Sequence, residues 1–412
     1  MASIDWNFTN TGTRHSTHGF HTYPAMLVPQ IAEELLNEYG KKSKTLFDPF
    51  CGTGTTLVEA NLKGIDAIGT DLNPLARLIS RVKTTAIRQQ TLDLFLKDFY
   101  DFLFKYRFGF EKKESVTSPK FNNINYWFSK TVSQDLAIIK SYIDRLKEES
   151  IKEFFLVAFS QTIRDTSWTR KNEFKLYKMD SEKLKNFKPD VFLLFESTLA
   201  RNRNGLVEFS GKKKNNSQSI VLDINTTHPI QSNILKPNTI DIVITSPPYG
   251  DSQTTVAYGQ FSRLTNQWLG NVEAYNLDPQ LMGGKKALEI EKFGNRSLNN
   301  CITRLSKIDN SRCRDVVSFY KDYQESIQNV AKVVRRKGIA CYVVSDRCVK
   351  GITLKTHLIT KDFFHRVGFE HVETIERKIS NKRMPRKNSP TGISGETRNL
   401  MNKEYIVVMR KK

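Results

Sequence analysis

The stretch TLFDPFCGTGTT, residues 45–56, joins a short apolar run to a glycine-rich turn. Residues 57–63 then have the pattern of a helix, and the apolar run at residues 66–70 ends at Asp71. Strand, glycine-rich turn, helix and strand in this order are typical of the opening of a doubly wound parallel sheet. We therefore predict an α/β fold that begins in this part of the chain.

Three apolar segments and two strand-like runs near the carboxyl end bring the expected sheet to seven strands. They occupy residues 220–223, 239–245, 338–345, 371–376 and 404–409. Apolar periodicity also predicts helices at residues 29–39, 131–147 and 320–334. The expected fold is thus a doubly wound, mostly parallel, seven-stranded sheet.

The segment between the 66–70 strand and the 220–223 strand is far longer than the helix or two that a parallel crossover needs. We therefore predict that residues 90–215 form an inserted, largely helical subdomain, in which residues 205–218 are a polar loop. Residues 1–89 and 216–412 are then the two parts of the sheet domain.

The charge predicts a polyanionic partner. Sixty-four Lys or Arg residues oppose 43 Asp or Glu residues, which gives a net charge of +21. Residues 331–412 alone hold 20 basic and 7 acidic residues, and a cluster between Lys378 and Lys387 holds five basic residues and no acidic one. Such a surface attracts phosphates and releases counterions when it binds them. Nucleic acid is therefore the expected partner.

Several classes of protein are disfavoured. Five cysteines at irregular spacings, without a CxxC pair, argue against a disulfide framework and against a zinc site. His15, His18 and His21 have no cysteine or carboxylate cluster beside them in the sequence, so we expect no metal. No apolar run approaches the roughly 20 residues of a membrane span. The N-terminus lacks a signal-peptide pattern, and we expect a cytoplasmic protein.

The glycine-rich turn has the parts of a nucleotide-type cofactor site. Gly52 and Gly54 lack a Cβ atom, so the backbone can approach a ligand closely, and the following helix presents free N–H groups. Asp71, at the end of the next strand, is placed to accept hydrogen bonds from ribose hydroxyls. This combination predicts a cofactor that contains adenosine.

A second motif, SPPY at residues 246–249, directly follows the 239–245 strand. Two prolines cannot continue a sheet ladder because neither has an N–H group. The segment must therefore leave the sheet as a rigid corner with fixed carbonyl groups. Ser246 before the prolines and Tyr249 after them supply a hydrogen-bonding oxygen and an aromatic ring, which suit a planar amino-heterocycle.

Together the two motifs resemble those of the DNA amino-methyltransferases, a family that methylates adenine N6 or cytosine N4. DPFCGTGT at 48–55 is similar to the cofactor loop of that family, and SPPY to its catalytic motif. HTYPAMLVP at 21–29 is similar to the segment that packs against the methionine part of the cofactor. The resemblance covers roughly residues 14–80 and 219–412, and it implies the methyltransferase version of the seven-stranded sheet.

The resemblance implies S-adenosylmethionine as cofactor and double-stranded DNA as substrate. The cofactor contacts that it implies are Tyr23, Pro24, Ala25, Asp48, Pro49, Phe50, Cys51, Gly52, Thr53, Gly54, Thr55, Asp71, Leu72, Asn73, Asp223 and Ile224. The catalytic residues are Ser246, Pro247, Pro248 and Tyr249. A cognate restriction endonuclease that acts on the same site is an expected partner.

In that family a serine in the first motif position favours cytosine N4, whereas aspartate or asparagine favours adenine N6. A base inside a duplex must be flipped out to reach such a pocket. Ser246 and the Pro247 carbonyl would then accept hydrogen bonds from the amino group, and Tyr249 would stack on the ring. The motif order, with the cofactor loop first, is not the commonest order among serine-type enzymes, and it points to residues 90–215 as the target-recognition region.

Contacts with DNA are expected from basic and aromatic residues in three places. In the insertion these are Arg164, Trp168, Arg170 and Lys171, and near the carboxyl end they are Lys382, Arg383, Arg386 and Lys387. Asp251, Tyr258 and Arg263 follow the SPPY motif and are candidates to line the base pocket or the DNA cleft.

Three other functions remain open at this point besides cytosine-N4 methylation. One is adenine-N6 methylation of DNA, and another is methylation of guanine N2 in RNA by an enzyme with similar motifs. The third is a non-catalytic DNA-binding protein on the same fold, against which the intact motifs argue. The RNA enzyme is disfavoured because position 246 is serine and not aspartate, and because the N-terminus has no recognisable RNA-binding domain.

Overall fold

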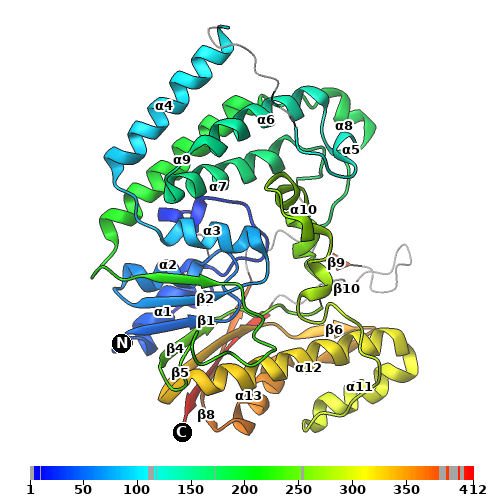
Figure 1. The fold of residues 1–412 in the computed structure, drawn as a ribbon. Coiled ribbons are helices and arrows are strands. Elements are labelled where there is room, and N and C mark those ends of the chain that lie inside the picture. Colours follow the sequence, from blue (N-terminus) through cyan, green and yellow to red (C-terminus); the bar gives the residue numbers. More distant parts are fainter. Residues whose placement is uncertain are drawn as a thin grey trace.

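The computed structural model describes residues 4–9, 11–109, 116, 118–171, 173–251, 255–379, 387–388, 398–399 and 403–412. Its centre is one seven-stranded sheet with the order β3-β2-β1-β4-β5-β11-β8 (Figure 1). The strands are β1 (Thr45–Asp48), β2 (Asp66–Thr70), β3 (Ser219–Leu222), β4 (Ile240–Thr245), β5 (Val334–Val344), β8 (Phe369–Lys378) and β11 (Lys403–Lys411).

The sheet is parallel from β3 to β5, and β11 runs antiparallel to both β5 and β8. The strand order reverses at β1 and β4, which lie side by side. In open α/β sheets the crevice outside the carboxyl ends of the strands at such a point is where ligands bind. The prediction of a mostly parallel, seven-stranded, doubly wound sheet is confirmed.

Both faces of the sheet are covered, and the alternation of side chains along β4 shows how. Ile242 and Ile244 join a core with α1 (Pro29–Tyr39) and α2 (Thr55–Leu62). Val243 between them joins a second core on the other face, with α11 (Arg296–Ile308), α12 (Asn310–Val333) and α13 (Thr356–Arg366). A strand that is buried on both faces needs a continuous apolar run, which β4 has at residues 242–244.

Among the described residues, six helices lie between α3 (Pro74–Thr84) and β3 and form the cyan-to-green lobe of Figure 1. They are α4 (Gln89–Arg107), α5 (Ile124–Trp127), α6 (Lys130–Arg145), α7 (Glu149–Thr166), α8 (Ser181–Asn186) and α9 (Val191–Lys212). A third apolar core joins this lobe to α3 and to α10 (Tyr258–Trp268). The exact subdomain boundaries at residues 89 and 215 stay a prediction.

One expectation within the lobe was wrong: residues 205–212 are the last turns of α9 and not a polar loop. Glycine is needed at position 205 for the packing of this helix, because a Cβ atom there would lie 2.3 Å from the carbonyl oxygen of Ser16. The glycine lets the helix cross closely over η1 (Ser16–Gly19), while Leu206 and Phe209 are buried in the lobe. Tertiary packing thus overrides the polar, glycine-containing local sequence.

The remaining elements are short. They are η2 (Val272–Tyr275), η3 (Asp278–Gln280), β6 (Arg347–Val349), β7 (Ile352–Leu354), β9 (Lys387–Asn388) and β10 (Arg398–Asn399). Among the described helices, none combines the length and the apolar character that a membrane span requires.

Candidate active site

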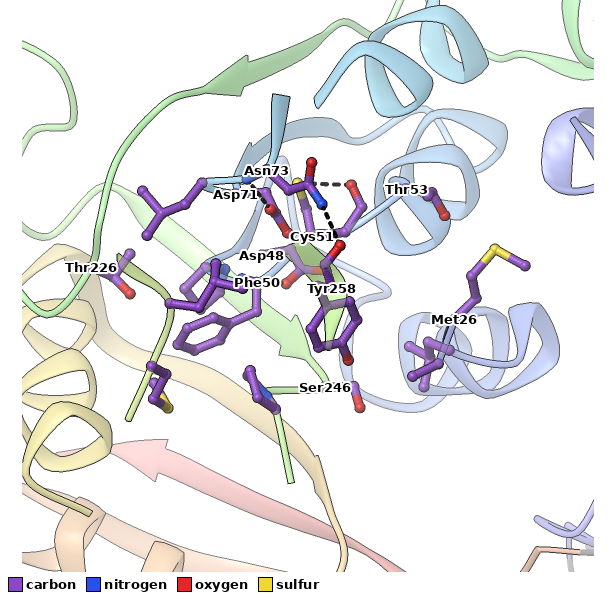
Figure 2. A pocket seen from close by; sticks show the side chains of 18 of the residues that line it. Met26, Asp48, Phe50, Cys51, Thr53, Asp71, Asn73, Thr226, Ser246 and Tyr258 are labelled. Atoms are coloured by element: carbon purple, nitrogen blue, oxygen red, sulfur yellow. Dashed lines mark hydrogen bonds between the residues drawn. The ribbon is translucent and has the colours of Figure 1, made fainter. Parts of the chain in front are cut away.

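A pocket lies at the carboxyl ends of β1, β2 and β4, and the SPPY motif shares it with the glycine-rich turn (Figure 2). Its lining comprises Tyr23, Pro24, Ala25, Met26, Leu27, Asp48, Pro49, Phe50, Cys51, Gly52, Thr53, Thr55, Thr56, Asp71, Leu72, Asn73, Ile224, Asn225, Thr226, Thr227, Ser246, Pro248, Tyr258, Leu281 and Met282. Segments almost 200 residues apart in the sequence therefore meet in one cavity.

The two glycines of the turn have different tasks. Gly54 has φ of +76°, and a Cβ atom there would lie 2.3 Å from the Ser80 hydroxyl on α3, so this position needs glycine for the packing of the turn. Gly52 has φ of +49°, and its missing Cβ would meet no atom within 4 Å. The Gly52 position therefore leaves open space on the pocket side, into which a ligand can approach the backbone.

We expect Gly54→Ala to lower the free energy of unfolding by about 1–3 kcal/mol, because alanine would face both a left-handed backbone and the Ser80 contact. Urea denaturation measures this change. Gly211→Ala is the matched control, since Gly211 lies in α9 with no atom within 4 Å of an added Cβ. Alanine there should be neutral or stabilising. Equal midpoints for the Gly54→Ala variant and the unaltered protein would contradict the role assigned to Gly54.

Asp71 is the acidic group at the end of β2, and its carboxylate helps to hold the turn. It accepts hydrogen bonds from the backbone N–H groups of Gly52 (3.1 Å) and Asn73 (2.7 Å). Burial raises the pKa of Asp71 to about 6, although these two hydrogen bonds and the nearby Arg77 oppose the shift. The side chain lines the pocket, so its remaining acceptor capacity faces a ligand.

Asn73 connects the glycine-rich side of the pocket to α10. Its side-chain oxygen caps α3 by accepting from the Leu75 N–H, and its amide nitrogen donates to the hydroxyls of Tyr23 (2.8 Å) and Ser262 (3.0 Å). Tyr23 stacks on Tyr258 with ring centroids 6.0 Å apart. Asn73 therefore fixes one aromatic wall of the pocket.

Asp48 links the glycine-rich turn to the strand that carries the second motif. Its carboxylate accepts from the hydroxyls of Thr56 on α2 (2.5 Å) and Thr245 at the end of β4 (2.6 Å), and from the Phe50 N–H. Burial raises the pKa of Asp48 to about 6, against these hydrogen bonds. Because these hydrogen bonds use much of the acceptor capacity of the carboxylate, Asp48 mainly links β1 to β4.

The SPPY corner leaves β4 as the two prolines require. Ser246 and Pro248 line the pocket, Pro247 is buried, and Tyr249 lies half-buried beside the lining. The Ser246 hydroxyl lies 3.3 Å from the carbonyl oxygen of Val343 on β5 and 3.3 Å from the Tyr249 hydroxyl. The chain after the corner is anchored by Asp251, which forms buried ion pairs with Arg347 (2.5 Å) and Arg312 (3.2 Å).

Most of the residues expected to hold the cofactor line this pocket, and two do not. Gly54 lies behind the turn against Ser80. Asp223 is outside the lining, because its largely exposed carboxylate pairs with Arg77 at 2.7 Å, and the next residue, Ile224, enters the pocket instead. A cofactor role for each individual residue stays a prediction.

The sequence patterns missed several lining residues: Met26, Leu27, Thr56, Asn225, Thr226, Thr227, Leu281 and Met282. Met26 and Leu27 lie in the HTYPAMLVP segment already singled out, and Thr56 lies in the quoted turn, so their neighbours gave a usable signal. Leu281 and Met282 follow η3 and gave none, since an apolar pair in a loop has no periodicity.

The expected DNA contacts of the insertion fall into two groups. Arg164 packs over the Phe261 ring at 3.8 Å and donates to the Glu173 carbonyl, and Lys171 donates to the carbonyls of Arg164 and Ser167. Arg164 is therefore partly buried inside the insertion, whereas Arg170 and Lys171 are exposed.

Three other expected DNA contacts lie outside the described residues: Lys382, Arg383 and Arg386. Lys387 is described by its backbone in β9. Arg263 lies over the Tyr275 ring at 5.0 Å and 3.9 Å from Asp278, and Tyr258 lines the pocket.

The histidines near the N-terminus meet a carboxylate that the sequence did not indicate. His15, His18 and Glu59 bring one ligand-type atom each within 4.8 Å of one another. The His18 Nε2 atom, however, lies 2.7 Å from Glu59 Oε1, which is the distance of a direct hydrogen bond. Burial lowers the pKa of His18 to about 4. We interpret this cluster as a structural contact that holds η1 against α2.

The chain is similar to known methyltransferases. A family model described as DNA methylase matches residues 4–81. The chain is 38% identical over 427 residues to the type II methyltransferase M.MvaI of Kocuria varians, across 98% of this chain and 93% of that protein. A tRNA (guanine(10)-N2)-dimethyltransferase of Methanothermobacter thermautotrophicus is 40% identical over 18% of this chain and 21% of its own. Among solved structures, the rRNA methyltransferase aviRa from Streptomyces viridochromogenes matches with a TM-score of 0.35 and 9% identity, over 95% of this chain and 88% of that one.

Proposed function

This chain belongs to the DNA amino-methyltransferase family, and we propose that it methylates the exocyclic N4 of a flipped-out cytosine in DNA, at a specific site. The observation that carries the proposal is the shared pocket: Ser246 and Pro248 line the same cavity as the glycine-rich turn. A base held at the SPPY corner would therefore be next to a cofactor held at the turn.

S-adenosylmethionine is the cofactor, and it supplies an electrophilic methyl group on its sulfonium when bound. The pocket fits such a molecule. The Thr53 hydroxyl is buried in the lining and has no hydrogen-bond partner among the described residues. The Gly52 position leaves room for a ligand at the backbone, and the Asp71 carboxylate can accept from ribose hydroxyls. Phe50, Leu72 and Ile224 supply apolar surface for an adenine ring.

The protein's own residues would act on the target base. An exocyclic amino nitrogen is a weak nucleophile because its lone pair is delocalised into the ring. Hydrogen bonds from the amino group to Ser246 and to the Pro247 carbonyl favour a pyramidal nitrogen, whose lone pair is available for direct attack. Tyr249 offers an aromatic face that offsets part of the cost of flipping, which is a few kcal/mol.

The proposed base rests on Ser246, since serine at this position favours cytosine in the family. The test is transfer of a radiolabelled methyl group to duplex DNA, followed by nucleoside analysis of the digest. We expect N4-methylcytosine. N6-methyladenine would overturn the base assignment but keep the DNA enzyme, label in RNA alone would favour the RNA enzyme, and label in neither would favour a non-catalytic protein.

We also propose that the surface around the 168–179 hairpin contacts the DNA. Thr169 and Lys178 pair across the hairpin, and the Lys178 ammonium lies over the rings of Tyr126 (4.1 Å) and Trp168 (4.7 Å). Arg170 and Tyr177 are exposed beside them. Exposed cations among aromatic rings suit phosphates and bases.

Arg170→Gln is expected to reduce the slope of log K for duplex DNA against log salt concentration by about 0.9, the value for one lost phosphate contact. Fluorescence anisotropy at several salt concentrations measures this slope. Lys105→Gln on α4 is the matched control, because Lys105 is also exposed but lies elsewhere on the lobe. An unchanged slope for the Arg170 variant would remove the hairpin from the proposed interface.

We further propose that a restriction endonuclease with the same recognition site accompanies the enzyme. The support is the type II methyltransferase that matches this chain over nearly its whole length. Methylated and unmethylated plasmid, challenged with endonucleases of the host, would test this pairing. Protection that depends on the methyltransferase is the expected result.

A further inference from the structure

A partly buried acidic residue outside the pocket lining makes direct contact with the SPPY motif. The Tyr249 hydroxyl donates to Glu404 Oε1 at 2.9 Å. Glu404 lies near the start of β11, 155 residues further along the chain, and its side chain is 13% exposed. Neither motif spacing nor periodicity connects these two residues.

Glu404 is itself held from the far side. Arg377 on β8 forms an ion pair with the other carboxylate oxygen, Oε2, and the Arg377 side chain is only 5% exposed. The same guanidinium donates to the backbone carbonyls of Trp6 (2.9 Å) and Asn7 (3.3 Å). A carboxylate with such fixed partners is a rigid acceptor.

The direction of these hydrogen bonds has a chemical consequence at Ser246. Because the Tyr249 hydroxyl gives its single proton to Glu404, its oxygen can only accept from Ser246, which lies 3.3 Å away. The other neighbour of Ser246, the Val343 carbonyl, is also an acceptor. The Ser246 proton is therefore directed to these two oxygens, and the Ser246 lone pairs are left for the target.

We propose that Glu404, anchored by Arg377, is a positioning residue that fixes the Tyr249 ring and orients the Ser246 hydroxyl as a hydrogen-bond acceptor for the amino group of the base. The proposal rests on the proposed function for its catalytic consequence. The contact itself does not depend on that function. Burial, with the charge of Glu404 as a second cause, raises the pKa of Tyr249 and keeps the phenol protonated, as a donor must be.

The catalytic test uses Glu404→Gln, Tyr249→Phe and the double variant in the full-length protein. Glutamine keeps the size of the side chain but can present its amide N–H group to the phenol, and phenylalanine removes the hydroxyl alone. We expect each single variant to lower kcat about tenfold with the Kd for S-adenosylmethionine unchanged. The double variant should lose no more than either single one, because both changes break the same contact.

Glu376→Gln is the matched control, since Glu376 on β8 pairs with Lys403 on β11 in an exposed ion pair. It should keep the kcat of the unaltered protein. A Glu404→Gln variant with unaltered kcat would overturn the proposal. Losses that multiply in the double variant would also overturn it, because the two residues would then act separately.

A second measurement does not need methyl transfer. Urea denaturation of the same four proteins gives the coupling between Tyr249 and Glu404 from the double-mutant cycle. We expect a coupling free energy larger than the experimental error even if the enzyme methylates a different base or none. Failure of the proposed function can therefore be distinguished from failure of the contact between Tyr249 and Glu404. Strict additivity in urea would show that the contact is not formed and would overturn the proposal by itself.

Discussion

Replacing Tyr249 by alanine should lower the rate of methyl transfer to DNA about a hundredfold while S-adenosylmethionine still binds. The substitution removes the ring on which the flipped base would stack, and base–aromatic stacking contributes about 1–3 kcal/mol. It also removes the donor to Glu404 and so releases the Ser246 hydroxyl. Losses of this kind together correspond to about 2.7 kcal/mol, or two powers of ten in rate.

The measurement is kcat with radiolabelled S-adenosylmethionine under saturating duplex DNA, together with the Kd of the cofactor by calorimetry. Tyr249 is outside the pocket lining, so the cofactor Kd is expected to stay within about threefold of the original. Tyr100→Ala on α4 is the control for a partly exposed tyrosine far from the motif. If the Tyr249 variant kept the original kcat, the SPPY corner would not be the catalytic centre.

A base-flipping assay separates the two contributions of Tyr249. A fluorescent 2-aminopurine at the target position brightens when it leaves the duplex stack. Tyr249→Ala should reduce this signal, because the ring that receives the base is gone, whereas Tyr249→Phe should retain it. The phenylalanine variant would then report the effect of the hydroxyl and Glu404 contact on chemistry alone.

Local patterns predicted the central strands of the sheet well because β1, β4 and the second half of β5 are buried on both faces. β4 has an unbroken apolar run at residues 242–244, and the turn after β1 needs glycine at position 54. Such requirements act on neighbouring residues and are therefore visible in the sequence. The same reasoning placed SPPY at the end of a strand, since two adjacent prolines exclude continued pairing.

Long-range pairings could not be predicted in this way. The carboxylate of Asp223 pairs with Arg77, and Arg164 packs over Phe261, so both side chains differ from what their positions suggested. The end of α9 depends on a backbone approach by Ser16. In each case a partner distant in the sequence decides the local outcome, and charge or composition alone carries no information about that partner.

The acidic residue at the end of β2 gives the second large effect. Asp71→Asn should raise the Kd of S-adenosylmethionine at neutral pH about a hundredfold. The backbone N–H groups of Gly52 and Asn73 both donate to the Asp71 carboxylate, and an amide can accept at only one of its two atoms. The variant therefore loses the charge that a ribose hydroxyl would use and also disturbs the turn. Charge-assisted hydrogen bonds contribute about 1.5–3 kcal/mol each.

The pH dependence of cofactor binding provides an independent check. Burial raises the pKa of Asp71 to about 6, and the ionised form is the acceptor. The Kd should therefore be constant above about pH 7 and rise about tenfold per pH unit below 6, as the carboxylate takes up a proton. Asp71→Asn should flatten this profile, whereas Asp144→Asn on α6, an exposed carboxylate, should leave it unchanged.

The weaker cofactor binding at low pH cannot result from unfolding caused by protonation of Asp71. Protonation of Asp71 changes the stability of the fold in the opposite direction. A carboxyl group whose pKa is raised in the folded state stabilises the fold at low pH, and this contribution is lost as the pH rises through about 6. Toward acid, Asp71 thus strengthens the fold while it weakens cofactor binding. A Kd that rose in parallel with a falling urea midpoint would assign the effect to other groups, and a flat Kd between pH 5 and 8 would remove Asp71 from the cofactor contacts.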